Sequence, residues 1–154
     1  MDWWIGDTGA SSHMCKVWKG FSNTKNINIK AEFAREDHEG KVDKRGTWTG
    51  IVQVLKKQGN ITPKQTIELH DVLYVPELRT NLFSIMKEIK TSGAKISNDD
   101  DILILKYPDG TSIYFDHILS TAKGFIPSAR IKALDMQPLN MIYNHFSCNM
   151  WSSI

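Results

Sequence analysis

The stretch that decides the fold lies near the start of the chain and reads Trp3-Trp4-Ile5-Gly6-Asp7-Thr8-Gly9-Ala10-Ser11-Ser12-His13-Met14. An apolar run, typical of a buried strand, leads here into an aspartate on a tight turn. Gly9 lets a second stretch of backbone approach this turn, and the Thr8 hydroxyl can brace it by hydrogen bonds. The pattern therefore predicts a carboxylate presented at the end of a strand, with Asp7 as the candidate catalytic residue.

A short Asp-x-Gly string is weak evidence alone, because such strings are common in ordinary turns. The chain contains another one, Asp109-Gly110-Thr111, between two strand-like runs and without an apolar lead-in. We interpret that string as a hairpin turn. For Asp7 a plain solvent-facing turn is the competing interpretation, and the surrounding sequence has to decide.

The surrounding sequence resembles the protease-like region of copia-type retrotransposon polyproteins, usually written Trp-Ile-x-Asp-Ser/Thr-Gly-Ala-Ser-x-His-Met. A second block of the same family is matched in order by Leu69-His70-Asp71-Val72-Leu73-Tyr74-Val75-Pro76-Glu77-Leu78-Arg79-Thr80-Asn81-Leu82-Phe83-Ser84-Ile85. The resemblance extends more loosely to Phe125 and fades after about Ala133. It implies a retropepsin-like β-barrel.

Composition sets broad limits on the class of protein. The chain has 154 residues, of which 41% are hydrophobic and 23% charged, as expected for one globular domain with a core. No apolar run approaches the ~20 residues that span a membrane, and no signal peptide is apparent, so we expect an intracellular, cytoplasmic location. The net charge of +2 is spread without a basic stripe, which argues against direct nucleic-acid binding.

Strand patterns dominate the chain. Alternating residues predict a strand over 27–33 that returns over 42–44 as a hairpin, followed by strands over 47–54 and 65–69 and an apolar run over 72–75. Pro76 should begin a loop that lasts to Asn81. Leu82, Ile85, Met86 and Ile89 have helical spacing, which predicts a helix from about Ser84 to Ser92 with Gly93 as its stop. A further hairpin is expected to join 102–105 to 112–115.

These elements predict a mostly β fold, a small closed barrel with one short helix. We expect the barrel domain to cover residues 1–133 and an irregular tail or linker fragment to cover 134–154. Only six residues precede Asp7, whereas retroviral-type proteases have a strand and a turn before their aspartate. The domain is therefore expected to be truncated at its N-terminus. Packing in the core is the expected use of Trp3, Trp4, Trp18 and Trp48.

By resemblance, Asp7, Thr8 and Gly9 form the catalytic turn and Ala10 lines its floor. Aspartate-based peptide hydrolysis needs two carboxylates that share a proton, and this chain offers one clear candidate, so the resemblance implies a homodimer. The substrate-covering flap is expected at Glu36-Asp37-His38-Glu39-Gly40-Lys41. This flap is poor in glycine, with Gly40 and Gly46 available, and Ser84 stands where retroviral-type proteases have a glycine.

Two functions stay open. The first is an aspartic endopeptidase acting on its own polyprotein. The alternative is a catalytically inactive β-barrel that binds a peptide or protein along a strand edge. No cofactor or metal is expected. A zinc site built from His13, Cys15, His145 and Cys148 has unusual spacing, and a packed histidine with free thiols is the simpler interpretation. Asp99-Asp100-Asp101 lacks the alternating ligands of a calcium loop.

Overall fold

The computed structural model describes residues 3–33, 38–53, 65–121 and 124–136. These residues form eleven strands and one helix, which confirms a mostly β fold with one short helix in this part of the chain. The elements are β1 (Trp3–Asp7), β2 (Met14–Cys15), β3 (Phe21–Phe33), β4 (His38–Gln53), β5 (Gln65–Tyr74), β6 (Asn81–Ser84), α1 (Ile85–Ser92), β7 (Lys95–Asp99), β8 (Ile102–Lys106), β9 (Ser112–Phe115), β10 (His117–Thr121) and β11 (Gly124–Ala133).

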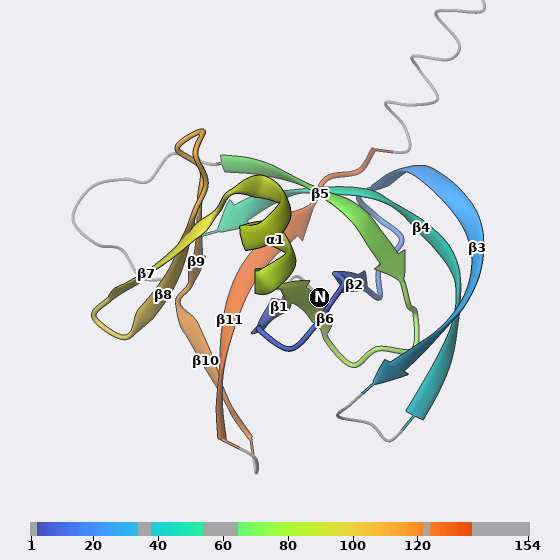
Figure 1. The fold of residues 1–154 in the computed structure, drawn as a ribbon, viewed down its shortest axis with the longest axis horizontal. Coiled ribbons are helices and arrows are strands. Elements are labelled where there is room, and N and C mark those ends of the chain that lie inside the picture. Colours follow the sequence, from blue (N-terminus) through green and yellow to red (C-terminus); the bar gives the residue numbers. More distant parts are fainter. Residues whose placement is uncertain (1–2, 34–37, 54–64, 122–123, 137–154) are drawn as a thin grey trace, which may run out of the picture.

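Eight of the strands form one strongly curved sheet in the order β10-β11-β1-β6-β2-β5-β4-β3. β11 also pairs with β4. This pairing links β11, β1, β6, β2, β5 and β4 into a ring of strands, each of which is hydrogen-bonded to its two neighbours in the ring. β10 and β3 lie at the two ends of this order, and the curvature is plain in Figure 1. β1 lies within the ring, parallel to β6 and antiparallel to β11.

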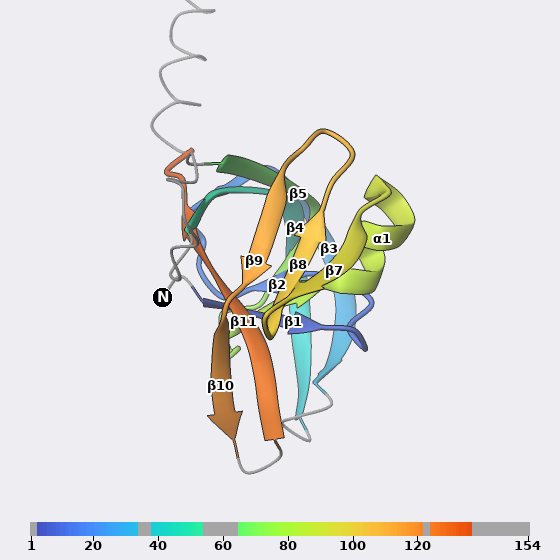
Figure 2. The same ribbon diagram turned by 90° about the vertical axis from the view of Figure 1, so that its left-hand side faces the viewer.

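A smaller antiparallel sheet of β7, β8 and β9 lies beside the helix α1 on one side of the barrel (Figures 1 and 2). The β8–β9 hairpin was predicted from the sequence and turns at Asp109 and Gly110, with a positive φ of 94° at Gly110. Among the described residues, no helix has the length and apolar character needed to cross a membrane.

The core fills the barrel with aromatic rings. Trp4 and Trp48 are almost fully buried, with ring centroids 4.7 Å apart, and Phe83 meets Phe115 edge to face at 5.5 Å. The predicted core packing is confirmed for these two tryptophans and for Trp18, which is half-buried but packs against the core and stacks on Phe21 at 5.5 Å. Trp3 is half-buried. Gly50 makes room for the Trp48 ring, because a Cβ at position 50 would lie 2.5 Å from its Cη2 atom.

Three of the predicted element boundaries were wrong. The strands expected at 42–44 and 47–54 are one strand, β4, whose register against β5 shifts between Gly46 and Trp48. The runs at 65–69 and 72–75 likewise join in β5, in which Asp71 has a positive φ of 52°. The predicted loop is present over residues 76–80, but it ends one residue early, because residues 81–84 form the short strand β6, which pairs in parallel with β1 and was not predicted.

The helix α1 has the predicted range, but its buried face differs in part from the predicted one. It begins after Ser84 and ends before Gly93, whose φ of 69° is the left-handed conformation that favours glycine. Ile85 is buried as expected, but Met86 is 37% exposed and Glu88 takes a buried position instead. The Leu134 amide donates to the Thr49 carbonyl oxygen at 3.0 Å, so main-chain bonding extends one residue past β11.

Candidate functional site

Asp7 lies at the last position of β1, half-buried, and is followed by the exposed residues Thr8 and Gly9. The Gly9 amide donates a 2.8 Å hydrogen bond to Asp7 Oδ1. Thr111 donates in the same way to Asp109 Oδ1, also at 2.8 Å. The local hydrogen bond therefore does not distinguish the two aspartates. Their positions do, because Asp7 ends a strand inside the barrel sheet and Asp109 lies on an exposed hairpin turn.

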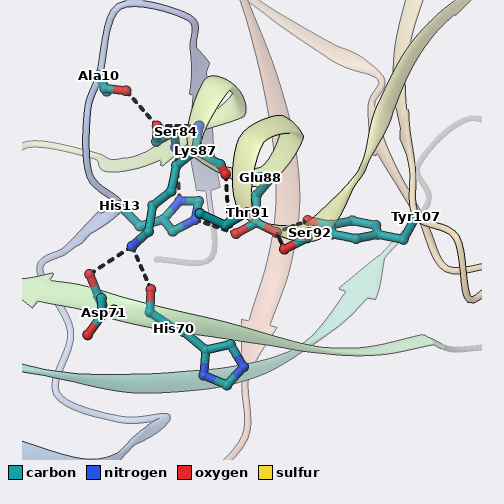
Figure 3. A network of polar contacts seen from close by, with 10 residues as sticks. All are labelled: Ala10, His13, His70, Asp71, Ser84, Lys87, Glu88, Thr91, Ser92 and Tyr107. Atoms are coloured by element: carbon teal, nitrogen blue, oxygen red, sulfur yellow. Dashed lines mark hydrogen bonds and ion pairs between the residues drawn. The ribbon is translucent and has the colours of Figure 1, made fainter.

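Ser84 connects the Asp7 turn to the helix. It is the partner of Asp7 in the parallel register of β1 and β6, and it is fully buried. Its hydroxyl donates to the Ala10 carbonyl oxygen and accepts a 3.2 Å bond from the Lys87 amide as the N-cap of α1. Its own amide donates to His13 Nδ1 at 2.9 Å (Figure 3). Ser84 therefore contacts both ends of the Asp7 turn, which comprises residues 7–10: it pairs with Asp7 and bonds to Ala10.

His13 lies between Ser84 and Glu88, with none of its surface exposed. Its Nε2 is 2.7 Å from Glu88 Oε1. Because Nδ1 accepts from the Ser84 amide, the ring proton of the neutral imidazole is on Nε2 and is donated to the Glu88 carboxylate. Burial lowers the pKa of His13, and the hydrogen bond and charge of Glu88 offset this only in part. The contacts and the pKa direction agree on a neutral imidazole.

Glu88 is a buried carboxylate with three hydrogen-bond donors. Besides His13, the Tyr107 hydroxyl donates to Oε2 at 2.7 Å and the Ser92 hydroxyl at 3.1 Å (Figure 3). Burial pushes the pKa of Glu88 upward, but these hydrogen bonds outweigh burial and hold the pKa below its ordinary value. Burial and the neighbouring carboxylate raise the pKa of Tyr107. The network therefore holds a charged glutamate, a neutral histidine and a protonated tyrosine.

The zinc alternative finds no support at His13, because both of its ring nitrogens are already hydrogen-bonded. Cys15 is a buried free thiol that donates to the Val17 carbonyl oxygen at 3.4 Å, and burial raises its pKa to about 12. His145 and Cys148 lie outside the described residues. Within residues 3–136, less the gaps, no group of three or more His, Cys, Asp or Glu side chains is placed to hold a metal ion.

The predicted flap is only partly described. Glu36 and Asp37 lie outside the described residues, while His38, Glu39, Gly40 and Lys41 begin β4 and pair with β3 from Phe33 back to Lys30. The predicted antiparallel return of the chain is therefore present. The structure groups Asp7, Thr8, Gly9 and Ala10 on one turn and places residues 38–41 on a separate hairpin, which extends to one side of the barrel in Figure 1.

Sequence reasoning missed Glu88 and Tyr107. Glu88 lies four residues after Ser84 and three after Ile85, on the buried side of α1, and an acid there requires partners in the core. That spacing was a usable signal. Tyr107 had none, because it reaches Glu88 only through the packing of the β8–β9 hairpin against the helix.

Comparison with known proteins agrees with the fold. Residues 4–94 match the family described as Pol polyprotein, beta-barrel domain, a range that contains Asp7, His13, Ser84 and Glu88. Over 82 residues the chain is 38% identical to a Saccharomyces cerevisiae protein described as putative transposon Ty5-1 protein, a match that covers 53% of this chain and 47% of the relative. The chain thus spans about half the length of that relative. No solved structure matches. The chain belongs to the family of Pol polyprotein beta-barrel domains.

Proposed function

We propose that this chain is the aspartic endopeptidase domain of a copia-type retrotransposon Pol polyprotein, with Asp7 as its catalytic carboxylate. The observation that carries the proposal is the position of Asp7 at the end of a strand inside the barrel, directly before an exposed turn. The Gly9 amide holds one carboxylate oxygen, Oδ1. Asp7 is therefore oriented by the backbone while its turn stays accessible to a partner and to substrate.

Peptide hydrolysis by this route needs a second carboxylate close to Asp7. One carboxylate takes a proton from water as the water oxygen attacks the scissile carbonyl carbon, and the other donates its proton to the carbonyl oxygen. When the resulting diol collapses, the carbon–nitrogen bond breaks and the first carboxylate gives the proton that it took from water to the leaving nitrogen. One diol hydroxyl returns its proton to the second carboxylate as the carboxylic acid product forms. Two such carboxylates cannot both ionise easily, so the pair carries one shared proton and titrates as a pair.

The second carboxylate is supplied by another copy of the chain. Asp109 is unsuited to the role, because it lies on the hairpin of the smaller sheet while Asp7 belongs to the barrel sheet. A homodimer with the two Asp7 turns facing each other provides the pair. Thr8 would brace the opposite turn, Gly9 would allow the close approach, and Ala10 would line the floor. The substrate would be the element's own polyprotein, covered by the hairpin around residues 36–41.

The test compares Asp7→Asn with Asp109→Asn, since both aspartates accept the same bond from the amide two residues later. The full chain is incubated with a fusion that carries its own flanking polyprotein sequence, across acidic to neutral pH, while sedimentation reports the mass. We expect cleavage by a dimer, reduced at least about a hundredfold in Asp7→Asn and unchanged in Asp109→Asn. Equal cleavage by both variants would contradict the aspartic mechanism.

The sheet order favours a second candidate function. β3 and β10 each have one neighbour in the order and offer an edge to which an extended peptide can add as a further strand. A catalytically inactive barrel would then act as a peptide- or protein-binding module. A folded monomer that binds polyprotein peptides without cutting them, and binds equally well after Asp7→Asn, would support this function instead.

A further inference from the structure

We propose that His13 is the positioning residue of the Asp7 turn and that its Nε2-protonated tautomer is the state that holds the turn. The inference deepens the proposed function and rests on it only for the catalytic role of Asp7. It concerns the link between the turn and the helix α1, which is formed by His13, Ser84 and Glu88.

The turn has few restraints of its own. Thr8, Gly9 and Ser11 are exposed, and the Gly9 bond to Asp7 is local. The hydrogen bonds that hold the chain on the C-terminal side of the turn, from Ala10 to His13, come from buried residues. The Ser84 hydroxyl holds the Ala10 carbonyl oxygen, the His13 ring accepts the Ser84 amide, and the His13 carbonyl oxygen accepts the Leu73 amide at 3.0 Å. His13 thus closes the turn against the end of β6, beside the position that pairs with Asp7.

The tautomer follows from the two partners of the ring. A main-chain amide can only donate, so Nδ1 must be unprotonated to accept from Ser84. A carboxylate can only accept, so Glu88 requires the proton on Nε2. Glu88 is itself held by Tyr107 and Ser92, which keep it charged and fixed in place (Figure 3). Its role in this arrangement is to select the tautomer that Ser84 needs.

A second proton on His13 would occupy Nδ1 and break the bond to the Ser84 amide. The charged groups that bear on the ring are the Glu88 carboxylate and the Lys87 ammonium, both from α1. From β6 the Phe83 ring packs against His13 with centroids 4.7 Å apart. Lys87 Nζ donates to the main-chain oxygens of His70 and Asp71, which keeps its charge directed toward β5.

Two substitutions separate the two bonds of His13. In His13→Asn the side-chain oxygen takes the place of Nδ1 and can accept from Ser84, but the donor to Glu88 is lost. In His13→Gln the side-chain amide takes the place of Nε2 and can donate to Glu88, but the acceptor for Ser84 is lost. The exposed pair of His70 and Glu68, 3.6 Å apart, offers matched controls in His70→Asn and His70→Gln.

The first readout is nuclear magnetic resonance of the wild-type chain. We expect the ring nitrogens of His13 to show an unprotonated Nδ1 and a protonated Nε2 at neutral pH. On acidification, the Ser84 amide should lose its protection from hydrogen exchange as His13 takes its second proton. A protonated Nδ1 at neutral pH, or a Ser84 amide that stays protected after His13 titrates, would overturn the proposal. These measurements need no variant to fold.

The second readout compares the variants. We expect Ser84 amide exchange to be at least about tenfold faster in His13→Gln than in His13→Asn, with greater motion of the Gly9 and Ser11 amides, because only the asparagine keeps the acceptor. The His70 variants should match wild type. Equal exchange in the two His13 variants would overturn the proposal. None of these measurements depends on cleavage. If the comparison of Asp7→Asn with Asp109→Asn contradicts the protease function, the exchange measurements still test the role of His13.

Discussion

At the scale of single residues, the unusual feature is a charge in the core. Glu88 is 4% exposed, and burying an ionised carboxylate is costly unless it is hydrogen-bonded. His13, Tyr107 and Ser92 supply three donors from three parts of the chain. The carboxylate therefore stabilises the fold only as long as these donors are present, and removing one of them exposes part of the cost of burial.

Tyr107→Phe tests this cost, since it removes the hydroxyl donor and keeps the ring. We expect the free energy of unfolding to fall by about 1–3 kcal/mol, measured by urea denaturation at neutral pH. Tyr114→Phe is the control, because Tyr114 is half-buried on the adjacent β9 and its hydroxyl has no hydrogen bond to a described residue. Equal losses in the two variants would show that the bond to Glu88 contributes nothing specific.

Stability should also depend on pH. The pKa of His13 is lowered in the folded state, so the unfolded chain takes up a proton first as the pH falls through about 6.5, and this favours unfolding. The pKa of Glu88 is lowered too, so its contribution is complete above about 4.5 and is lost as the pH falls through its folded pKa. Both effects act in the same direction.

We therefore expect the free energy of unfolding to decrease steadily from pH 7 to pH 4, as measured by urea denaturation at several pH values. Glu88→Gln cannot ionise, so its stability should depend less on pH below about 4.5. A wild-type stability that is level, or that rises toward acid, would contradict the assigned protonation states of the pair.

At the scale of elements, α1 is short and depends on its two ends. Eight residues are too few for a helix to be stable by itself in water, so capping and packing have to hold it. Ser84 caps the first turn with its hydroxyl, and Gly93 ends the helix with a left-handed φ of 69° while its amide donates to the Glu88 carbonyl oxygen. The helix in turn places Glu88 against His13, which accepts a hydrogen bond from the Ser84 amide beside the Asp7 turn. Loss of either helix end should therefore also disturb the Asp7 turn.

Gly93→Ala should cost about 1 kcal/mol, because alanine is strained in the left-handed conformation. The added Cβ would meet Pro108 Cγ at 3.5 Å, which is an ordinary contact, so the cost comes from the backbone. Gly93→Asn should cost less, since asparagine tolerates this conformation better. Thermal unfolding of the two variants checks the order, and an alanine variant as stable as the asparagine variant would contradict it.

At the scale of the whole molecule, the pairing of β11 with β4 joins the two strands that lie next to the ends of the sheet order, β10 and β3. Ile131 is fully buried at this junction, where it pairs with Val52. A Cβ on Gly50 would lie 2.9 Å from Ile131 Cγ2, which shows how closely the two strands approach. The junction is therefore part of the main core, beside Trp48 and Trp4.

Ile131→Ala should reduce the free energy of unfolding by about 2–5 kcal/mol, the usual range for truncating a buried isoleucine. Lys132→Ala, at the adjacent exposed position, should change it by less than about 0.5 kcal/mol. Urea unfolding followed by tryptophan fluorescence and by circular dichroism measures both variants. If the barrel unfolds as one unit, the two probes give the same midpoint. A loss in Ile131→Ala no larger than that in Lys132→Ala would contradict a core position for the junction.

Much of this architecture could be predicted because its signals are local. The strand before Asp7, the β8–β9 hairpin and the limits of α1 follow from apolar period, turn residues and caps. Features that depend on distant partners could not be predicted in this way. β6 is a four-residue strand that exists because β1 lies beside it, and Tyr107 reaches Glu88 only after the smaller sheet has packed. Met86 matched the helical period but is exposed, whereas Glu88 is buried, because His13, Tyr107 and Ser92 donate hydrogen bonds to its carboxylate.

The bond from the Ser84 amide to His13 joins residues 71 positions apart in the sequence. Its two partners differ in how many residue types can supply them. Every residue except proline brings a main-chain amide to position 84, whereas few side chains can accept at the place of Nδ1. In a saturation library scored for folded protein, position 13 should therefore tolerate few substitutions. Position 84 should accept small hydroxyl residues readily, through the additional bond to Ala10, and should reject proline outright. The sequence information for this contact is stored at one of its two ends.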